Sequence, residues 1–143
     1  TENLTKNFKN PSDAEVRKDF VGGWATDKES KFVASGRTAQ ENEAFNFTKI
    51  LANYRKSSAA LQSGKLTQYL PQDGIYVYFR HKGTQSVMVI MSQAKEVKTL
   101  STKRFAENLA GFTKGKEIAT NKDIMSLDNI TVAPMSIQVI ELN

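Results

Sequence analysis

One stretch near the start of the chain, residues 17–24 (RKDFVGGW), combines side chains that suit sugar recognition. Charged groups such as Arg17 and Asp19 can hydrogen-bond hydroxyl groups, and flat aromatic rings can stack on the faces of pyranose rings. Two glycines precede the tryptophan and let the backbone turn sharply beneath the large ring. We therefore predict four substrate-binding residues: Arg17, Asp19, Phe20 and Trp24. The alternative, which composition alone favours, is that the two rings anchor the loop in a core.

No arrangement typical of catalysis is present in the sequence. The single histidine, His81, lies in a predicted hairpin turn, where a histidine is usually a solvated surface residue. Because the chain has no cysteine and no second histidine, it lacks thiolate chemistry and the common zinc-site patterns. It also lacks the phosphate-binding glycine motifs and the nucleophile elbow, and no acidic pair is marked out for glycoside hydrolysis. We expect no catalytic residue, no metal and no cofactor.

The chain is centred on residues 74–92 (GIYVYFRHKGTQSVMVIMS), which predict a β-hairpin. Apolar β-branched and aromatic residues alternate at the period of two, and a short polar loop, residues 81–84, contains a glycine. Both faces of the second strand are largely apolar, so we expect each face to be covered. Tyr76 and Tyr78 share one face of the first strand. They suit a stacking platform for glycans or nucleic acids, or a contact between domains, which we prefer.

A helix is predicted before the hairpin, over residues 38–56. Thr38 and Glu41 form a capping box, and apolar residues including Phe47, Leu51 and Tyr54 recur at helical spacing. This apolar stripe requires a large apolar surface, which another part of the protein or a second copy of the chain would supply.

Short strands separated by turn residues predict an antiparallel sandwich after the helix. The chain therefore divides near Ser63, into residues 1–62 and residues 63–143. Besides the hairpin, the predicted elements are strands at 66–70, 95–100, 116–120, 124–127, 130–132 and 137–142, with helical turns at 104–109.

Composition is that of a globular protein, with 39% hydrophobic and 24% charged residues. The net charge of +5 is spread evenly along the chain, whereas a nucleic-acid-binding protein usually concentrates its charge. No apolar run reaches the roughly 20 residues of a membrane-spanning helix. We expect neither a nucleic-acid partner nor a membrane span. The absence of an initial Met suggests an excerpt of a longer protein or a processed chain.

Three runs resemble the C-terminal end of alpha-amylase superfamily glycosidases, in particular the neopullulanase/cyclomaltodextrinase-like enzymes of Bacteroidetes. They are VRKDFVGGWATDKESKF, GRTAQENEAFNFTKILANYRKSSAALQSGKL and PQDGIYVYFRHKGTQSVMVIMS. The resemblance covers nearly the whole chain. Arg17, Asp19, Phe20 and Trp24 match the family's loop position by position, whereas Val21 stands where relatives usually have proline.

This resemblance implies a (β/α)8 catalytic barrel followed by a small antiparallel β-sandwich. Residues 1–36 would be the loop after barrel strand 8, residues 38–56 the last barrel helix, and residues 64–143 the sandwich. The expected fold class is thus mainly β with one long helix: an antiparallel sandwich preceded by the last loop and helix of a barrel.

The family's catalytic carboxylates lie on earlier barrel strands and have no counterpart here. The resemblance thus implies a structural fragment of an enzyme that hydrolyses α-glucans such as starch, maltodextrins, cyclodextrins or pullulan. Its partners would be an α-glucan oligosaccharide and the missing barrel, and a homo-oligomer is an option. The implied location is the periplasm or the cell surface, with the cytoplasm as alternative. A non-catalytic carbohydrate-binding module and a protein-interaction sandwich are the competing hypotheses.

Overall fold

The structure, a computed structural model, describes residue 17 and residues 19–143. The expected loop over residues 1–36 therefore lies partly outside the described residues. The chain divides into two compact units, Thr1–Phe45 and Asn46–Asn143. The domain boundary expected between residues 62 and 63 refers to the family architecture and stays a prediction.

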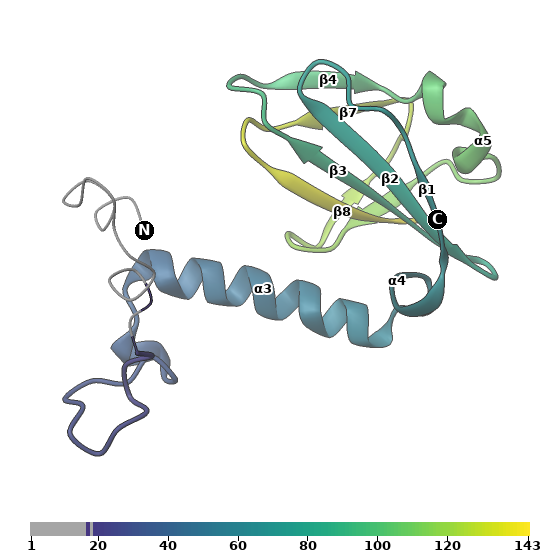
Figure 1. The fold of residues 1–143 in the computed structure, drawn as a ribbon. Helices are drawn as coiled ribbons and strands as arrows, with labels where there is room; N and C mark the ends of the chain where they lie inside the picture. The colour runs from purple at the N-terminus through teal and green to yellow at the C-terminus, as the bar shows by residue number, and fades with distance from the viewer. Residues whose placement is uncertain (1–16, 18) are drawn as a thin grey trace. The chain divides into compact units, whose positions relative to one another are not determined.

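The second unit, which we call the β unit, contains two antiparallel sheets (Figure 1). The larger has the strand order β1-β2-β3-β8-β5-β6, and the smaller pairs β4 with β7. This arrangement agrees with the predicted antiparallel β domain. The strands are β1 (Lys65–Gln68), β2 (Ile75–Lys82), β3 (Gln85–Ser92), β4 (Lys98–Ser101), β5 (Gly115–Glu117), β6 (Lys122–Ile124), β7 (Asn129–Val132) and β8 (Ile137–Leu142).

The helical elements of the described residues are mostly short, apart from α3 with its 19 residues. None of the described helices is both long and apolar enough to cross a membrane. That the barrel strands would precede α3 stays a prediction. The elements are the 3-10 helices η1 (Ala34–Gly36) and η2 (Lys103–Phe105) and the α-helices α3 (Ala39–Ser57), α4 (Ala59–Ser63) and α5 (Ala106–Leu109).

The predicted hairpin is confirmed as β2 and β3, which pair from Ile75 opposite Ser92 to Lys82 opposite Gln85. The connection is tighter than expected, because only residues 83 and 84 lie between the last paired residues. Gly83 has a φ of +58°, a conformation that glycine adopts without steric cost and that two-residue hairpin turns require. β2 therefore continues through residues that the sequence had placed in the turn.

Both faces of β3 are buried, as the sequence predicts. Its inner face joins a core between the two sheets, which also includes buried residues of β7 and η2. The core members are Ile75, Val77, Phe79, Met88, Ile90, Phe105, Leu127, Ile130, Val132, Ile140 and Leu142.

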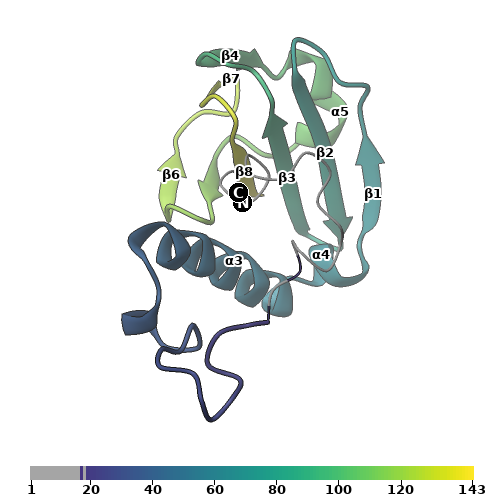
Figure 2. The same ribbon diagram turned by 60° about the vertical axis from the view of Figure 1, so that its left-hand side comes forward.

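The outer face of the six-stranded sheet is covered at one end by helical residues. Ala60 of α4 is fully buried there beside Val87 and Val89 of β3, and Figure 2 shows α4 at this end of β2 and β3. Leu51 and Tyr54 of α3 pack against the same cluster. The predicted apolar stripe of the helix thus finds part of its partner surface within its own unit.

The side chain of Gln85 fixes α4 against the sheet. Its Oε1 accepts hydrogen bonds from the Ser58 hydroxyl at 3.0 Å and from the Ala60 amide at 2.9 Å, while its Nε2 donates to Glu141 at 2.9 Å. Ser58 also caps α4, because its hydroxyl accepts from the Leu61 amide at 3.2 Å. These hydrogen bonds together satisfy the polar groups of a partly buried junction.

The strands expected at 116–120 and 124–127 were wrong in their bounds. The structure instead has a short hairpin, in which β5 ends at Glu117 and β6 begins at Lys122. The Glu117 carboxylate accepts from the amides of Ala119 at 3.2 Å and Thr120 at 2.6 Å, which closes a turn where the sequence suggested a continuing strand. Three-residue strands are too short to show a reliable alternation.

The capping box at the start of α3 is confirmed. The Glu41 amide donates to the Thr38 hydroxyl at 3.2 Å, and the Thr38 amide donates to the Glu41 carboxylate at 2.7 Å. Lys31 adds an ion pair to the same carboxylate at 2.8 Å. The hydrogen bond from Lys31, followed by that from the Thr38 amide, lowers the pKa of Glu41 to about 2.

We expect this cap to be sensitive to acid. Because the pKa of Glu41 lies below the usual 4.5, its stabilising contribution is complete above that value and is lost as the pH falls toward 2. An NMR titration of the side-chain carboxyl carbon measures the midpoint directly. Lys31→Met should raise the midpoint, whereas Lys28→Met serves as the matched control and should not. A midpoint near 4.5 in the unmodified chain would contradict this account.

Candidate functional site

Residues 19–33, which hold three of the four predicted substrate-binding residues (all but Arg17), form a closed turn that we call the aromatic loop. One carboxylate organises it: Asp27 Oδ2 accepts from the amide of Gly22 at 2.7 Å and from the amide of Trp24 at 3.1 Å. The amide of Asp27 in turn donates to the carbonyl of Trp24 at 3.1 Å. Backbone amides that converge on an anion make a stable local structure.

Two glycines allow the chain to pack closely around Ser30. Gly22 has a φ of +101°, and a Cβ atom there would lie 2.4 Å from the Ser30 hydroxyl oxygen. At Gly36 a Cβ would lie 1.9 Å from the Ser30 carbonyl oxygen. The Lys31 amide donates to the Val21 carbonyl at 2.9 Å and closes the loop. Valine and proline both have a backbone carbonyl. This hydrogen bond therefore does not depend on whether position 21 holds the valine of this chain or the proline that is usual in relatives.

The predicted site residues lie on the surface of the described structure. The side chains of Phe20 and Trp24 are 60% and 66% exposed, and Arg17 and Asp19 are also exposed. Phe20 makes an edge-to-face contact with Phe32, with ring centres 4.8 Å apart. Neither predicted ring is buried in a core of the described residues. Their role in substrate binding stays a prediction.

Sequence reasoning missed Asp27 and Ser30, which shape the aromatic loop without being part of the predicted site. The available signal was an acidic residue shortly after two glycines, a combination in which free backbone amides can bind a carboxylate. Arg37 was also missed. Its Nη1 donates to the Lys31 carbonyl at 2.7 Å, and its guanidinium lies 3.9 Å from the ring centre of Phe45.

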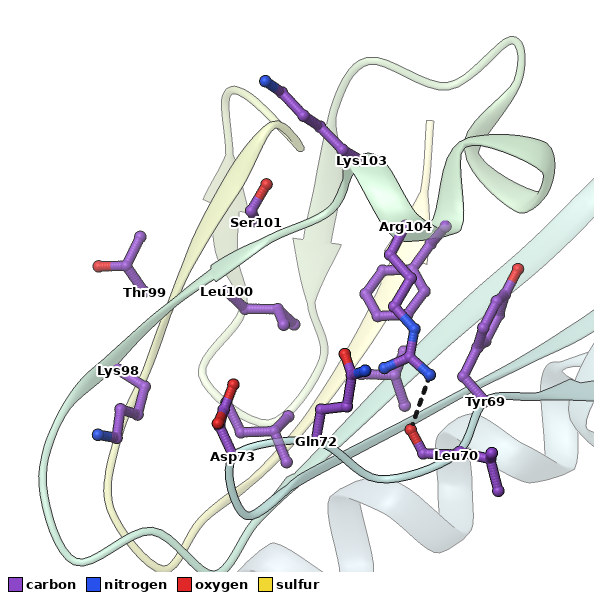
Figure 3. A pocket seen from close by; sticks show the side chains of 13 residues that line it. Tyr69, Leu70, Gln72, Asp73, Lys98, Thr99, Leu100, Ser101, Lys103 and Arg104 are labelled. Carbon is purple, nitrogen blue, oxygen red and sulfur yellow. Dashed lines mark hydrogen bonds between the residues drawn. The ribbon is translucent and has the colours of Figure 1, made fainter.

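A pocket of about 510 Å³ opens at the edge of the β unit, between the β1–β2 connection and the segment from β4 to η2 (Figure 3). We call it the end pocket. Its polar lining includes Gln72, Asp73 and Arg104, whose side chains Figure 3 shows gathered on one side. The other polar residues of the lining are Tyr69, Lys98, Thr99, Ser101 and Lys103. Apolar side chains from both sheets and η2 also line it: Ile75, Val77, Leu100 and Phe105.

The connection from β1 to β2 places Asp73 at this pocket. Gln72 and Ile75 exchange two backbone hydrogen bonds, of 3.0 and 2.8 Å. Between them, Asp73 and Gly74 both have positive φ, +51° and +77°. A two-residue turn with two positive φ values favours the Asp-Gly pair, which explains the sequence at this point.

Arg104 is held in place by backbone and aromatic groups. Its Nη2 donates to the Leu70 carbonyl at 2.9 Å, as the dashed line in Figure 3 marks, and its guanidinium lies 5.7 Å from the ring centre of Tyr69. The Tyr69 hydroxyl donates to Glu107 at 2.7 Å. Burial, followed by this hydrogen bond, raises the pKa of Tyr69.

His81 is not the solvated turn residue that the sequence suggested. It lies in β2, stacks on Phe79 with ring centres 5.9 Å apart, and joins a hydrogen-bond chain. Its Nδ1 lies 2.8 Å from the Ser86 hydroxyl and its Nε2 2.8 Å from Asn108 Oδ1. The Asn108 side-chain amide donates to the Tyr69 hydroxyl, so the chain extends to the wall of the end pocket.

The described residues contain no group of three or more histidine, aspartate or glutamate side chains placed to hold a metal ion. Of the two tyrosines of β2, Tyr78 packs against the apolar cluster on the outer face of the six-stranded sheet, so its ring is not freely available for stacking. Burial also raises the pKa of its hydroxyl. Tyr76 is tilted by 40° against it and donates its hydroxyl to Gln68 at 2.6 Å.

Comparison with known proteins places this β domain in a family. Residues 66–141 match the cyclo-malto-dextrinase C-terminal domain. A cyclomaltodextrin glucanotransferase of Klebsiella oxytoca is 38% identical over 66 residues, which are 46% of this chain and 10% of that protein. The chain thus spans about a tenth of the length of this curated relative.

Solved structures with a similar fold come from longer enzymes. AmyP in complex with maltose has a TM-score of 0.64 at 16% identity, over 73% of this chain and 21% of that one. The alpha-amylase of Geobacillus thermoleovorans, complexed with acarbose, has a TM-score of 0.60 at 14% identity, over 75% and 24%. At these identities the likeness establishes the fold alone.

The two antiparallel sheets and these similarities define a β domain whose fold is shared with AmyP and with the alpha-amylase of Geobacillus thermoleovorans. The chain belongs to the cyclo-malto-dextrinase C-terminal domain family. The sequence resemblance to the C-terminal end of cyclomaltodextrinase-like enzymes is thereby confirmed for the β domain.

We expect Asp27→Ala to loosen the aromatic loop without unfolding the β unit, because the carboxylate holds two local amides. Trp24 is the only tryptophan, so its fluorescence anisotropy reports on this loop alone and should fall in the variant. Urea-unfolding midpoints followed by circular dichroism should change little. Glu29→Ala, which removes an exposed acid of the same loop, is the control. Unchanged Trp24 anisotropy in the Asp27 variant would refute the role of this carboxylate.

Proposed function

We propose that this chain is the C-terminal part of an α-glucan hydrolase, with a structural role of its own. The observation that carries the proposal is the match of residues 66–141 to the cyclo-malto-dextrinase C-terminal domain. The names of the relatives support the substrate class, since they include a cyclomaltodextrin glucanotransferase and AmyP in complex with maltose. The parent enzyme would cleave glucosidic bonds with retention, through two carboxylates and a covalent intermediate.

In this proposal residues 1–62 belong to the end of the catalytic barrel and residues 63–143 cap it. Exposed apolar residues on α3 support a missing partner surface: Phe47 and Ile50 are 37% and 40% exposed. The barrel would cover them, and a second copy of the chain is the alternative occupant. Assignment to the neopullulanase-like branch of Bacteroidetes, and to the periplasm or cell surface, rests on the sequence resemblance.

A non-catalytic carbohydrate-binding module is the second candidate function. The aromatic loop favours this function, because the rings of Phe20 and Trp24 are exposed to solvent while the backbone amide of Trp24 is hydrogen-bonded within the loop. Both proposals assign the aromatic loop to a glucan. They differ in whether a catalytic barrel precedes it.

We expect the isolated chain to be catalytically silent, because its sequence offers no carboxylate pair in a cleft. The test is to incubate it with starch, pullulan and cyclodextrins and to assay new reducing ends. The full-length protein, expressed from its natural coding sequence, is the matched positive control and should release sugars. Turnover by the isolated chain that survives rigorous purification would overturn the structural role, and an inactive full-length protein would favour the binding module.

In the full-length protein we expect Trp24→Ala to lower kcat/KM about tenfold while the melting temperature stays nearly constant. Stacking of an aromatic ring is worth about 0.5–1.5 kcal/mol beyond area burial, which corresponds to a rate effect of this size. Trp24→Phe keeps a ring and should retain part of the activity. A large loss of stability with normal kinetics in the surviving folded enzyme would remove Trp24 from the site.

A further inference from the structure

We propose that the end pocket, lined by Gln72, Asp73 and Arg104, binds a short segment of an α-glucan chain. The choice of an α-glucan rests on the proposed function, whereas the choice of a neutral sugar rests on the pocket itself. No residue of the end pocket belongs to the aromatic loop, so the two sites can be tested separately.

The polar side of the pocket offers donors and acceptors together. Arg104 presents a planar set of N–H donors, Asp73 is an acceptor when ionised, and the Gln72 amide is both. Neighbouring hydroxyl groups of a sugar need this combination, because each hydroxyl donates one hydrogen bond and accepts others. All three residues line the same pocket, and Figure 3 shows their side chains in the same part of it.

The apolar lining complements the other surface of a sugar. Leu100 of β4 and Phe105 of η2 line the pocket together with Ile75 and Val77 of β2. A pyranose ring has an apolar face of C–H groups, which such side chains can cover. The volume of about 510 Å³ lies within the usual range for small-molecule sites, which combine apolar walls with a few polar groups.

The charges of the pocket favour a neutral ligand over an anion. The carboxylate of Asp73 lies on the same side as the Arg104 guanidinium, so a phosphate would meet an acid as well as a base. Lys98 forms an ion pair with Glu96 at 2.6 Å, which offsets its charge. The Lys103 side chain points away from the pocket in Figure 3.

The Arg104 guanidinium and the backbone that carries Asp73 are held in position before a ligand arrives. The turn at Asp73 and Gly74 is closed by two backbone hydrogen bonds, which fix the backbone from which the Asp73 side chain projects. The Leu70 carbonyl and the Tyr69 ring place the guanidinium, and Glu107 in turn fixes the Tyr69 hydroxyl. Preorganisation of this kind lowers the cost of ordering side chains on binding.

The test is an NMR titration of the 15N-labelled chain with maltoheptaose. We expect shifts at the amides of Leu100, Ser101 and Arg104. The double variant Gln72→Ala/Asp73→Asn should weaken the binding seen at these amides about tenfold, since it removes the Gln72 amide and replaces the charged acceptor at position 73 by a neutral amide. Asparagine tolerates the positive φ of position 73, so the turn should survive.

Two controls separate this pocket from other effects. Lys103→Ala removes a charge that points away and should leave the shifts unchanged. Trp24→Ala should abolish any shifts in the aromatic loop and leave those at the end pocket. Unchanged affinity at the pocket amides in the double variant would overturn the proposal, as would shifts there with inorganic phosphate but not with maltoheptaose.

Cellohexaose, a β-linked glucan, distinguishes the failure of this proposal from the failure of the proposed function. If neither sugar shifts the pocket amides, the end pocket is not a sugar site, and the proposed function is untouched. If cellohexaose binds there and maltoheptaose does not, the α-glucan assignment is overturned here and weakened for the whole protein. Binding of maltoheptaose with sensitivity to the double variant is the supporting result.

Discussion

The β unit depends on the burial of both faces of β3. Residues 86–90 of this strand are buried without interruption, so a cover is needed on each side of the sheet. The smaller sheet and η2 supply the inner cover, and α4 with the last turns of α3 supplies the outer one. Full burial of an aliphatic side chain is worth about 1.5–3 kcal/mol. Removal of either cover would expose several such side chains together, which makes the helix and the sheets one cooperative unit.

Polar contacts decide where the outer cover lies, because an apolar surface alone does not select one position for a short helix. Gln85 makes that selection through its bonds to Ser58, Ala60 and Glu141. The Glu141 carboxylate also influences Tyr54 of α3. Burial raises the pKa of Tyr54, and the nearby charge of Glu141 raises it further. Burial and the charge of Glu141 thus both favour the neutral form of Tyr54.

Features encoded within a few residues could be predicted from the sequence, whereas features built from distant residues could not. The β2–β3 hairpin and the cap of α3 follow from local periodicity and from the spacing of Thr38 and Glu41. The contact of His81 with Asn108 joins residues 27 positions apart and has no periodic signal. The end pocket likewise combines the β1–β2 turn with β4 and η2, so only the fold brings its polar groups together.

The aromatic loop presents a different relation between sequence and site. Its hydrogen bonds join residues close in sequence, such as Asp27 with Gly22 and Trp24, so the backbone can keep its shape without a surrounding core. Yet the rings of Phe20, Trp24 and Phe32 remain 60%, 66% and 65% exposed. Rings this exposed contribute little to folding through burial, and of the three only Phe20 and Phe32 are in ring contact. Exposed apolar patches usually mark an interaction surface. The proposed function assigns these exposed rings to the recognition of a glucan, and this assignment stays a prediction.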